Sequence, residues 1–328
     1  MNANHPCFAD AHVCLNFYGT KPKVDPCLPL SLAVIESPAA VRDEDSLKWA
    51  LMWGGLLNDW CSCSRRLVFA VEEQTGHRHY HGLLMQAGMK VVVWPDKPYV
   101  DINLPALARW RDHMRGKALK IDMRAIDALS TRNVSGNEDG GAVYVDLSHV
   151  SEARAIALLK EIERNGHKPK PIITHTGMAR VYNHPRNVCD EVAGRVVALG
   201  GVVCLTTRVY HLTSDGAEID PFLKHLECAL KLCGVEHVGI GSGGIYADMN
   251  FTDERGVHTQ KFWEVKEWYD LTYTKKRTCS GLQMRFPDQP ERLYVRDRMT
   301  VLHEVIAKEF GPEIANAVCG ENLIRFFS

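Results

Sequence analysis

Four short segments each place a histidine or a carboxylate at the end of an apolar run. If the runs are strands of an α/β barrel, their C-terminal ends converge on one face, where such barrels have their active sites. Imidazole, thiolate and carboxylate groups gathered there are ligands for a borderline-soft ion such as zinc. The segments are Asp10-Ala11-His12, Val71-Glu72-Glu73, Asp146-Leu147-Ser148-His149 and Thr174-His175-Thr176.

A single histidine at a strand end is more often a cap or a hydrogen-bonding residue than a metal ligand. His149 and His175, however, end neighbouring runs, and His12 and Glu72 stand at the same place in theirs. This repetition favours a shared metal site. Glu72 ends an apolar run, where a carboxylate needs a partner charge. Its alternative role is that of an acid at a helix N-terminus, which Glu73 can also fill.

Short apolar runs alternate with amphipathic helical patterns along the 328 residues. Val, Ile and Leu dominate the runs, as in strands buried on both faces. The alternation predicts an α/β fold, a closed (β/α)8 TIM barrel, with a doubly wound open sheet as the alternative. The expected strands are Cys7–His12, Leu32–Glu36, Leu67–Glu72, Lys90–Trp94, Ala142–Asp146, Pro171–His175, Val202–Thr206 and His237–Gly241, and the expected helices include Ser151–Asn165, Asp190–Leu199 and Pro221–Cys233.

We expect one domain over residues 1–328, because no linker or repeat divides the chain. Two segments do not follow the strand–helix rhythm, at about residues 95–138 and 246–300. Each follows a predicted strand, so both would emerge on the face that carries the C-terminal strand ends. There they are predicted to form the walls of a substrate pocket.

The charge balance, with Lys+Arg 39 against Asp+Glu 40, predicts neither a nucleic-acid nor a membrane partner. Residues 1–6 form no apolar signal segment, and no run reaches the roughly 20 apolar residues of a membrane helix. Eleven cysteines are scattered through apolar segments. They predict reduced thiols and a cytoplasmic location.

The ordered motifs of the chain resemble those of the membrane dipeptidase (renal dipeptidase, peptidase M19) family of the amidohydrolase superfamily. The resemblance is strongest over Gly140–Ser242. The motifs that carry it are Asp10-Ala11-His12-Val13-Cys14, similar to D-x-H-x-D, Val71-Glu72, Asp146-Leu147-Ser148-His149-Val150, Thr174-His175-Thr176, His184-Pro185-Arg186-Asn187-Val188, Gly239-Ile240-Gly241-Ser242 and Gly320-Glu321-Asn322-Leu323-Ile324-Arg325.

This resemblance implies an amidohydrolase-like barrel with a binuclear zinc site. By position in the motifs, His149 and His175 would hold one zinc and His12 the other, with Glu72 between them. Cys14 stands where the family has an aspartate ligand. A thiolate is a good zinc ligand, so Cys14 either replaces that aspartate or is a small buried apolar residue beside a lost metal.

The resemblance also implies that Arg186 would bind the terminal carboxylate of a substrate, a role that suits a planar guanidinium because it matches a carboxylate through two hydrogen bonds. The alternative is a structural ion pair with Asp190. Asp96 aligns with the substrate-polarising histidine of the family, and a carboxylate donates no hydrogen bond to a developing oxyanion unless it is protonated.

Gly243 stands where the family has its catalytic aspartate, and glycine cannot move a proton. Asp248, a few residues later, is a candidate substitute. The expected catalytic residues are therefore Glu72, Cys14 and Asp248, and the expected substrate-binding residues are Arg186 and Asp96.

The leading hypothesis is a metal-dependent amidohydrolase with a remodelled active site that acts on a small amino-acid-derived substrate with a carboxylate, such as a dipeptide-like amide. Two alternatives remain. One is a non-hydrolytic tailoring reaction, in which Cys14 tunes the metal or acts as nucleophile. The other is a catalytically inactive protein that binds a metal or ligand. The resemblance also makes a homodimer the expected assembly.

Overall fold

The structure is a computed structural model that describes residues 7–13, 30–36, 44, 47–48, 51, 66–72, 83, 89–93, 144–148, 150–164, 166, 169–214, 218–243, 251–252, 258–259, 290–293 and 297–328. For some residues within strands, among them His12 and Glu72, only the backbone is described.

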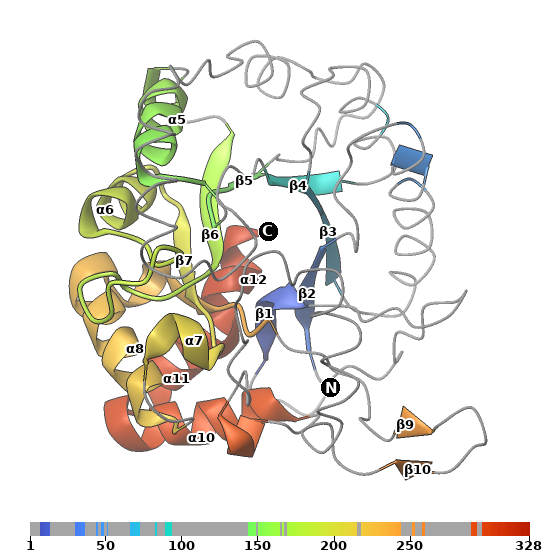
Figure 1. Ribbon diagram of the computed structural model, residues 1–328, viewed down its shortest axis with the longest axis vertical. Coiled ribbons are helices and arrows are strands. Elements are labelled where there is room, and N and C mark those ends of the chain that lie inside the picture. The colour runs from blue at the N-terminus through green and yellow to red at the C-terminus, as the bar shows by residue number, and fades with distance from the viewer. Residues whose placement is uncertain are drawn as a thin grey trace.

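A single sheet of parallel strands forms the centre of the molecule (Figure 1). Its strands pair strictly in chain order, without the reversal that marks a doubly wound sheet. The predicted (β/α)8 barrel is therefore confirmed, and the open-sheet alternative is wrong. The strands are β1 (Ala9–Val13), β2 (Leu32–Glu36), β3 (Arg66–Glu72), β4 (Met89–Val93), β5 (Tyr144–Asp146), β6 (Lys170–Thr176), β7 (Val202–Leu205) and β8 (Val238–Ile240).

Helices cover the outside of the second half of the barrel, where α6 and α8 contact β6, β7 and β8 (Figure 1). The three helices expected from the sequence are present to within one or two residues. A two-stranded antiparallel pair stands apart from the barrel sheet. These elements are α5 (Glu152–Arg164), α6 (Asp190–Ala198), α7 (Val209–Leu212), α8 (Asp220–Cys233), η1 (Val235–His237), β9 (Phe251–Thr252), β10 (His258–Thr259), η5 (Glu291–Leu293), α10 (Arg298–Phe310), α11 (Pro312–Asn316), the π-helix η6 (Ala317–Glu321) and α12 (Asn322–Phe326).

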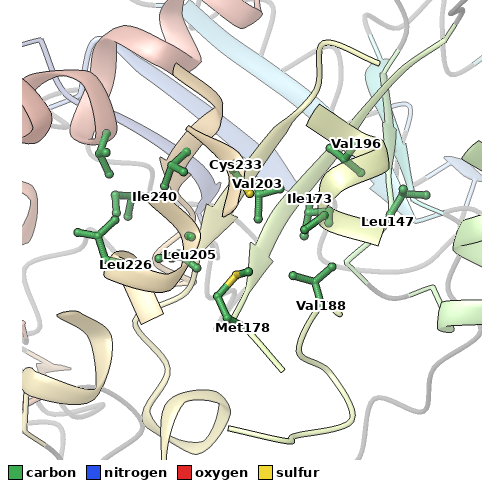
Figure 2. Packing of buried hydrophobic residues seen from close by; sticks show 14 of the residues in the cluster. Leu147, Ile173, Met178, Val188, Val196, Val203, Leu205, Leu226, Cys233 and Ile240 are labelled. Atoms are coloured by element: carbon green, nitrogen blue, oxygen red, sulfur yellow. The ribbon is translucent and has the colours of Figure 1, made fainter. Parts of the chain in front are cut away.

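The period of two along each strand divides the buried side chains into two layers. Ile172 and Cys204 belong to an inner cluster, which Phe326 and Phe327 complete from the C-terminal end of the chain. Residues of the opposite parity, such as Ile173, Val203 and Leu205, pack outward against α6 and α8 (Figure 2). Both faces of the strands are therefore buried, which is why the strands read as continuous apolar runs.

The C-terminal motif fastens the last helices to β8. The side-chain amide of Asn322 donates to the carbonyls of Val235 and Val238, at 2.7 and 2.8 Å. Arg325 Nη2 donates to Glu236 O and to Asn322 Oδ1, both at 2.9 Å. A Cβ at Gly320 would overlap the backbone oxygen of Cys7. The motif thus has a structural role in closing the barrel.

No helix in the described ranges is both long and apolar enough to cross a membrane. The single-domain prediction, with pocket walls at about residues 95–138 and 246–300, falls largely outside those ranges and stays a prediction.

Candidate active site at the strand ends

His175 lies near the C-terminal end of β6, with a side chain that is 4% exposed. Its Nδ1 is 3.0 Å from the hydroxyl of Thr174. A histidine held through one ring nitrogen is the usual arrangement for a metal ligand, because the second hydrogen bond orients the ring. The hydroxyl of Thr174 therefore orients the His175 ring, and the role of His175 as a metal ligand stays a prediction.

Asp146, at the end of β5, joins this strand end to the next. Its carboxylate accepts hydrogen bonds from the backbone N–H groups of Ser148 (2.9 Å) and Thr174 (3.1 Å) and from both hydroxyls, at 2.6 Å from Ser148 and 2.5 Å from Thr174. Ser148 Oγ in turn accepts the backbone N–H of His175 at 3.1 Å. The Asp146 carboxylate and the Ser148 hydroxyl thus hold the backbone of β6 at Thr174 and His175.

A second buried carboxylate, Asp10 of β1, connects the two ends of the sheet. It accepts hydrogen bonds from the backbone N–H (2.9 Å) and the hydroxyl (2.5 Å) of Ser242, which directly follows the end of β8. Thr207 donates to the carbonyl of Ser242 at 2.9 Å, so β7 joins the same junction. His12 belongs to the strand that these contacts hold.

Arg208 occupies the volume that a side chain at position 243 would need. A Cβ built on Gly243 would lie 2.6 Å from Arg208 Nε, and Arg208 Nη2 donates to Gly243 O at 2.7 Å. Gly243 also has a φ of +63°, a left-handed conformation that favours glycine. Position 243 therefore has no acidic side chain, and the Arg208 guanidinium lies where such a side chain would be.

We expect the substitutions Gly243→Ala and Arg208→Ala to be coupled. Gly243→Ala should destabilise the protein by about 2 kcal/mol, from the left-handed backbone and from contact with the Arg208 side chain. Removing that side chain relieves only the contact, so the double variant should be about 1 kcal/mol more stable than additivity predicts. Urea unfolding of the four proteins measures this coupling, and strict additivity would contradict the packing described above.

Arg186 lies on the loop after β6, half-buried, next to the strand end that carries His175. Its backbone oxygen accepts a hydrogen bond from Thr176 Oγ1 at 3.2 Å. Asn187 shapes the loop, because its Oδ1 accepts the N–H of Gly177 at 2.9 Å and its Nδ2 donates to the carbonyls of Tyr182 and His211. Asp190 forms its ion pair with Arg180, so the alternative of an Arg186–Asp190 pair is not the pairing that the structure contains.

A group of rings joins this loop to α7. The imidazole of His184 stacks on Tyr182 and on His211, with centroids 6.0 and 5.1 Å apart. Tyr210 meets both His184 and His211 edge-on. Such pairs add to the energy of area burial, so the loop carrying Arg186 and the helix that follows Arg208 form one packed unit.

His225 of α8 forms hydrogen bonds to both parts of that unit. Its Nδ1 accepts the N–H of Met178 at 2.7 Å, which leaves the ring proton on Nε2, 3.0 Å from the carbonyl of Leu212. Burial of the imidazole lowers the pKa of His225 to about 4, against a partial opposing effect from the Leu212 hydrogen bond. The neutral ring is therefore the form that the fold requires.

Of the residues predicted for the site, the structure describes the side chains of His175 and Arg186 and brings their segments together through Thr176. The backbones of His12 and Glu72 lie at the C-terminal ends of β1 and β3. The remaining predicted residues, Cys14, Asp96, His149 and Asp248, lie outside the described ranges. Within those ranges, no group of three or more potential ligands gathers in the way a metal site needs.

Sequence reasoning assigned no role to Arg208, His225 or Asp146. Asp146 belongs to a motif used for recognition, so its position was a usable signal. His225 and Arg208 carry no local signal, because their partners lie on other elements.

The parallel strands pair in chain order, and the Asp10–Ser242 hydrogen bonds join the first strand to the last, so the fold is a (β/α)8 barrel. An amidohydrolase from Pseudomonas aeruginosa has the same fold, with a TM-score of 0.65 over 98% of this chain and 95% of that one, at 14% identity. A metallopeptidase from Rhodobacter sphaeroides, solved with a phosphinate mimic of the dipeptide L-Ala-D-Ala, has a TM-score of 0.58 over 98% of both chains, also at 14% identity.

Residues 134–251 of the chain match the model of the membrane dipeptidase (peptidase M19) family. A dipeptidase of Clonostachys rogersoniana is 29% identical over 152 residues, 43% of this chain and 39% of that protein. An uncharacterized dipeptidase of Schizosaccharomyces pombe is 36% identical over 103 residues, 30% of this chain and 24% of that protein. The matched part thus spans less than half the length of either relative, and the resemblance seen in the motifs is confirmed.

Proposed function

We propose that this protein is a metal-dependent amidohydrolase of the dipeptidase type, acting on a small amide or dipeptide-like molecule with a free carboxylate. One observation carries the proposal: His175 and Arg186 lie on adjoining segments within the stretch that matches the M19 family. The hydroxyl of Thr176, next to the proposed metal ligand His175, donates a hydrogen bond to the backbone oxygen of Arg186, the proposed carboxylate-binding residue.

The residues present fit a zinc site by chemistry. His175 has a buried imidazole oriented by a hydroxyl. His12, Glu72, His149 and Cys14 are residues of the types that zinc accepts as ligands. When bound, zinc would acidify a water molecule and polarise the amide carbonyl. The chain's own contribution is to hold the ligands at the ends of rigid strands and to position the substrate.

Arg186 would orient that substrate. Its segment is fixed by Thr176 and Asn187, so the guanidinium starts from a rigid backbone. A charge-assisted hydrogen bond is worth about 1.5–3 kcal/mol, which would give this residue a large share of the affinity for a terminal carboxylate. A rigid anchor also limits the orientations in which the amide enters the site.

Metal removal should abolish hydrolysis of a dipeptide panel, and readdition of zinc should restore it. We expect at least one equivalent of zinc per chain by plasma mass spectrometry, reduced in His175→Ala but retained in the matched control His303→Ala on the outer helix α10. Arg186→Gln should keep its zinc and raise KM about tenfold or more, in line with the loss of one charged hydrogen bond.

Two outcomes count against hydrolysis. A protein that binds zinc but is inert toward every dipeptide would favour the non-hydrolytic or ligand-binding alternative, which the guanidinium at the place of an acid already supports. Zinc content unchanged by His175→Ala would remove His175 from the ligand set.

A further inference from the structure

The hydroxyls beside His175 allow the position of its ring proton to be worked out. Thr174 Oγ1 has one proton and three close neighbours: Asp146 Oδ2 at 2.5 Å, His175 Nδ1 at 3.0 Å and Ser148 Oγ at 3.1 Å. A carboxylate oxygen can only accept. At 2.5 Å from Asp146 Oδ2, the Thr174 hydroxyl must therefore donate to it, because two oxygens that close repel without a proton between them.

The proton of Ser148 is also assigned. Ser148 Oγ donates to Asp146 Oδ1 at 2.6 Å and accepts the backbone N–H of His175 at 3.1 Å. Neither hydroxyl then has a proton left for the imidazole. Thr174 Oγ1 can only accept from His175, so the ring proton lies on Nδ1 and the lone pair on Nε2.

We propose that Asp146 is a positioning residue that, through the Thr174 hydroxyl, holds His175 in the Nδ1–H tautomer. Nε2 then has the lone pair that a metal ion would use. This metal-binding consequence rests on the proposed function, whereas the tautomer itself does not. Asp146 thus acts on the site without touching substrate or metal, and Thr174 transmits its effect.

The substitution Asp146→Asn should reverse the tautomer. Asp146 Oδ1 accepts two backbone N–H groups, from Ser148 and Thr174, so the amide oxygen must take that place. The amide nitrogen then faces Thr174 and donates to its hydroxyl. The Thr174 hydroxyl then donates its hydrogen bond to His175 Nδ1, so the neutral imidazole carries its proton on Nε2. An amide differs from the carboxylate by little in shape, so the exchange tests proton direction rather than packing.

The test is 15N NMR of histidine-labelled, metal-free protein at about pH 8, above the ordinary imidazole pKa. A His175→Gln variant assigns the signals. We expect a protonated Nδ1 and an unprotonated Nε2 in the wild type, the reverse in Asp146→Asn, and the wild-type pattern in the conservative variant Thr174→Ser. Thr174→Val, which lacks the hydroxyl, should lose the fixed preference.

A wild-type protein with its proton on Nε2 would overturn the proposal, because Asp146 would then be the donor to Thr174. An unchanged tautomer in a folded Asp146→Asn variant would also overturn it, with circular dichroism as the check on folding. Zinc titration separates the two ideas. If the function holds, zinc affinity falls about 10–100-fold in Asp146→Asn. If the tautomer is as stated but no zinc binds, only the proposed function fails.

Discussion

Replacing Gly241 by alanine should destabilise the protein by about 4 kcal/mol or more, which is exceptional for a single methyl group. Gly241 directly follows β8, where its N–H donates to Leu205 O at 2.9 Å. A Cβ there would overlap the carbonyl oxygen of Thr174 and lie 3.3 Å from His175 Cα. These are backbone atoms, which cannot rotate away as a side chain can.

The matched control for this effect is Gly194→Ala in α6. A Cβ at Gly194 would meet nothing within 4 Å, so alanine should there stabilise the helix by about 0.5–1 kcal/mol. Chemical unfolding of both variants measures the contrast. A cost below about 1 kcal/mol for Gly241→Ala would mean that β8 and β6 do not approach as closely as described.

The position of Gly241 connects stability with the site. The backbone that its methyl group would displace is the one that carries His175. If the protein binds zinc as proposed, a partly folded Gly241→Ala variant should therefore also lose zinc, whereas Gly194→Ala should retain it. The glycine in this motif is thus explained by the close approach of two strand ends, and not by catalysis.

Replacing His225 by phenylalanine should cost about 3–5 kcal/mol, although the ring volume is nearly kept. The variant leaves the N–H of Met178 and the carbonyl of Leu212 without the imidazole, in a fully buried position. Each orphaned backbone group costs about 1–3 kcal/mol. Lys224→Gln, at the exposed neighbouring position of α8, is the control and should change the stability by less than about 0.5 kcal/mol.

His225 should also make the stability of the protein depend on pH. Its pKa falls from 6.5 in the unfolded chain to about 4 in the fold, so the unfolded state binds more protons between these values. The contribution of the neutral His225 to the free energy of unfolding is fully present above about pH 6.5. It declines as the pH falls and is lost below about pH 4, which lowers the free energy of unfolding by about 3 kcal/mol in total.

Unfolding curves measured from pH 4 to pH 7 test this dependence. The wild type should lose stability toward acid, and His225→Phe should lack that part of the slope because it has no proton to bind. Parallel curves for the two proteins would contradict the assignment. His225 holds Met178, in the segment that leads to Arg186, and Leu212 of α7. If Arg186 binds the substrate as proposed, substrate binding should therefore weaken together with stability at the acid end.

Much of the fold was predictable from local patterns. The run Ile172–Ile173 is apolar because β6 is buried on both faces, and the polar residues that follow it mark the strand end. The family motifs also indicated Arg186 and His175, because a motif records residue types at fixed spacing along the chain. Cys14, Asp96, His149 and Asp248 remain predictions that the described residues do not test.

The sequence by itself determined the order of strands and helices and the chemical types at the strand ends, because both depend on short-range periodicity. Only the tertiary structure decided which groups meet. Asp10 and Ser242 bond across 232 residues, His225 reaches Met178 across 47, and Arg208 takes the space beside Gly243 across 35. Such contacts depend on how the strands are staggered around the barrel and on which faces of the helices are buried. No local pattern in the chain encodes that register.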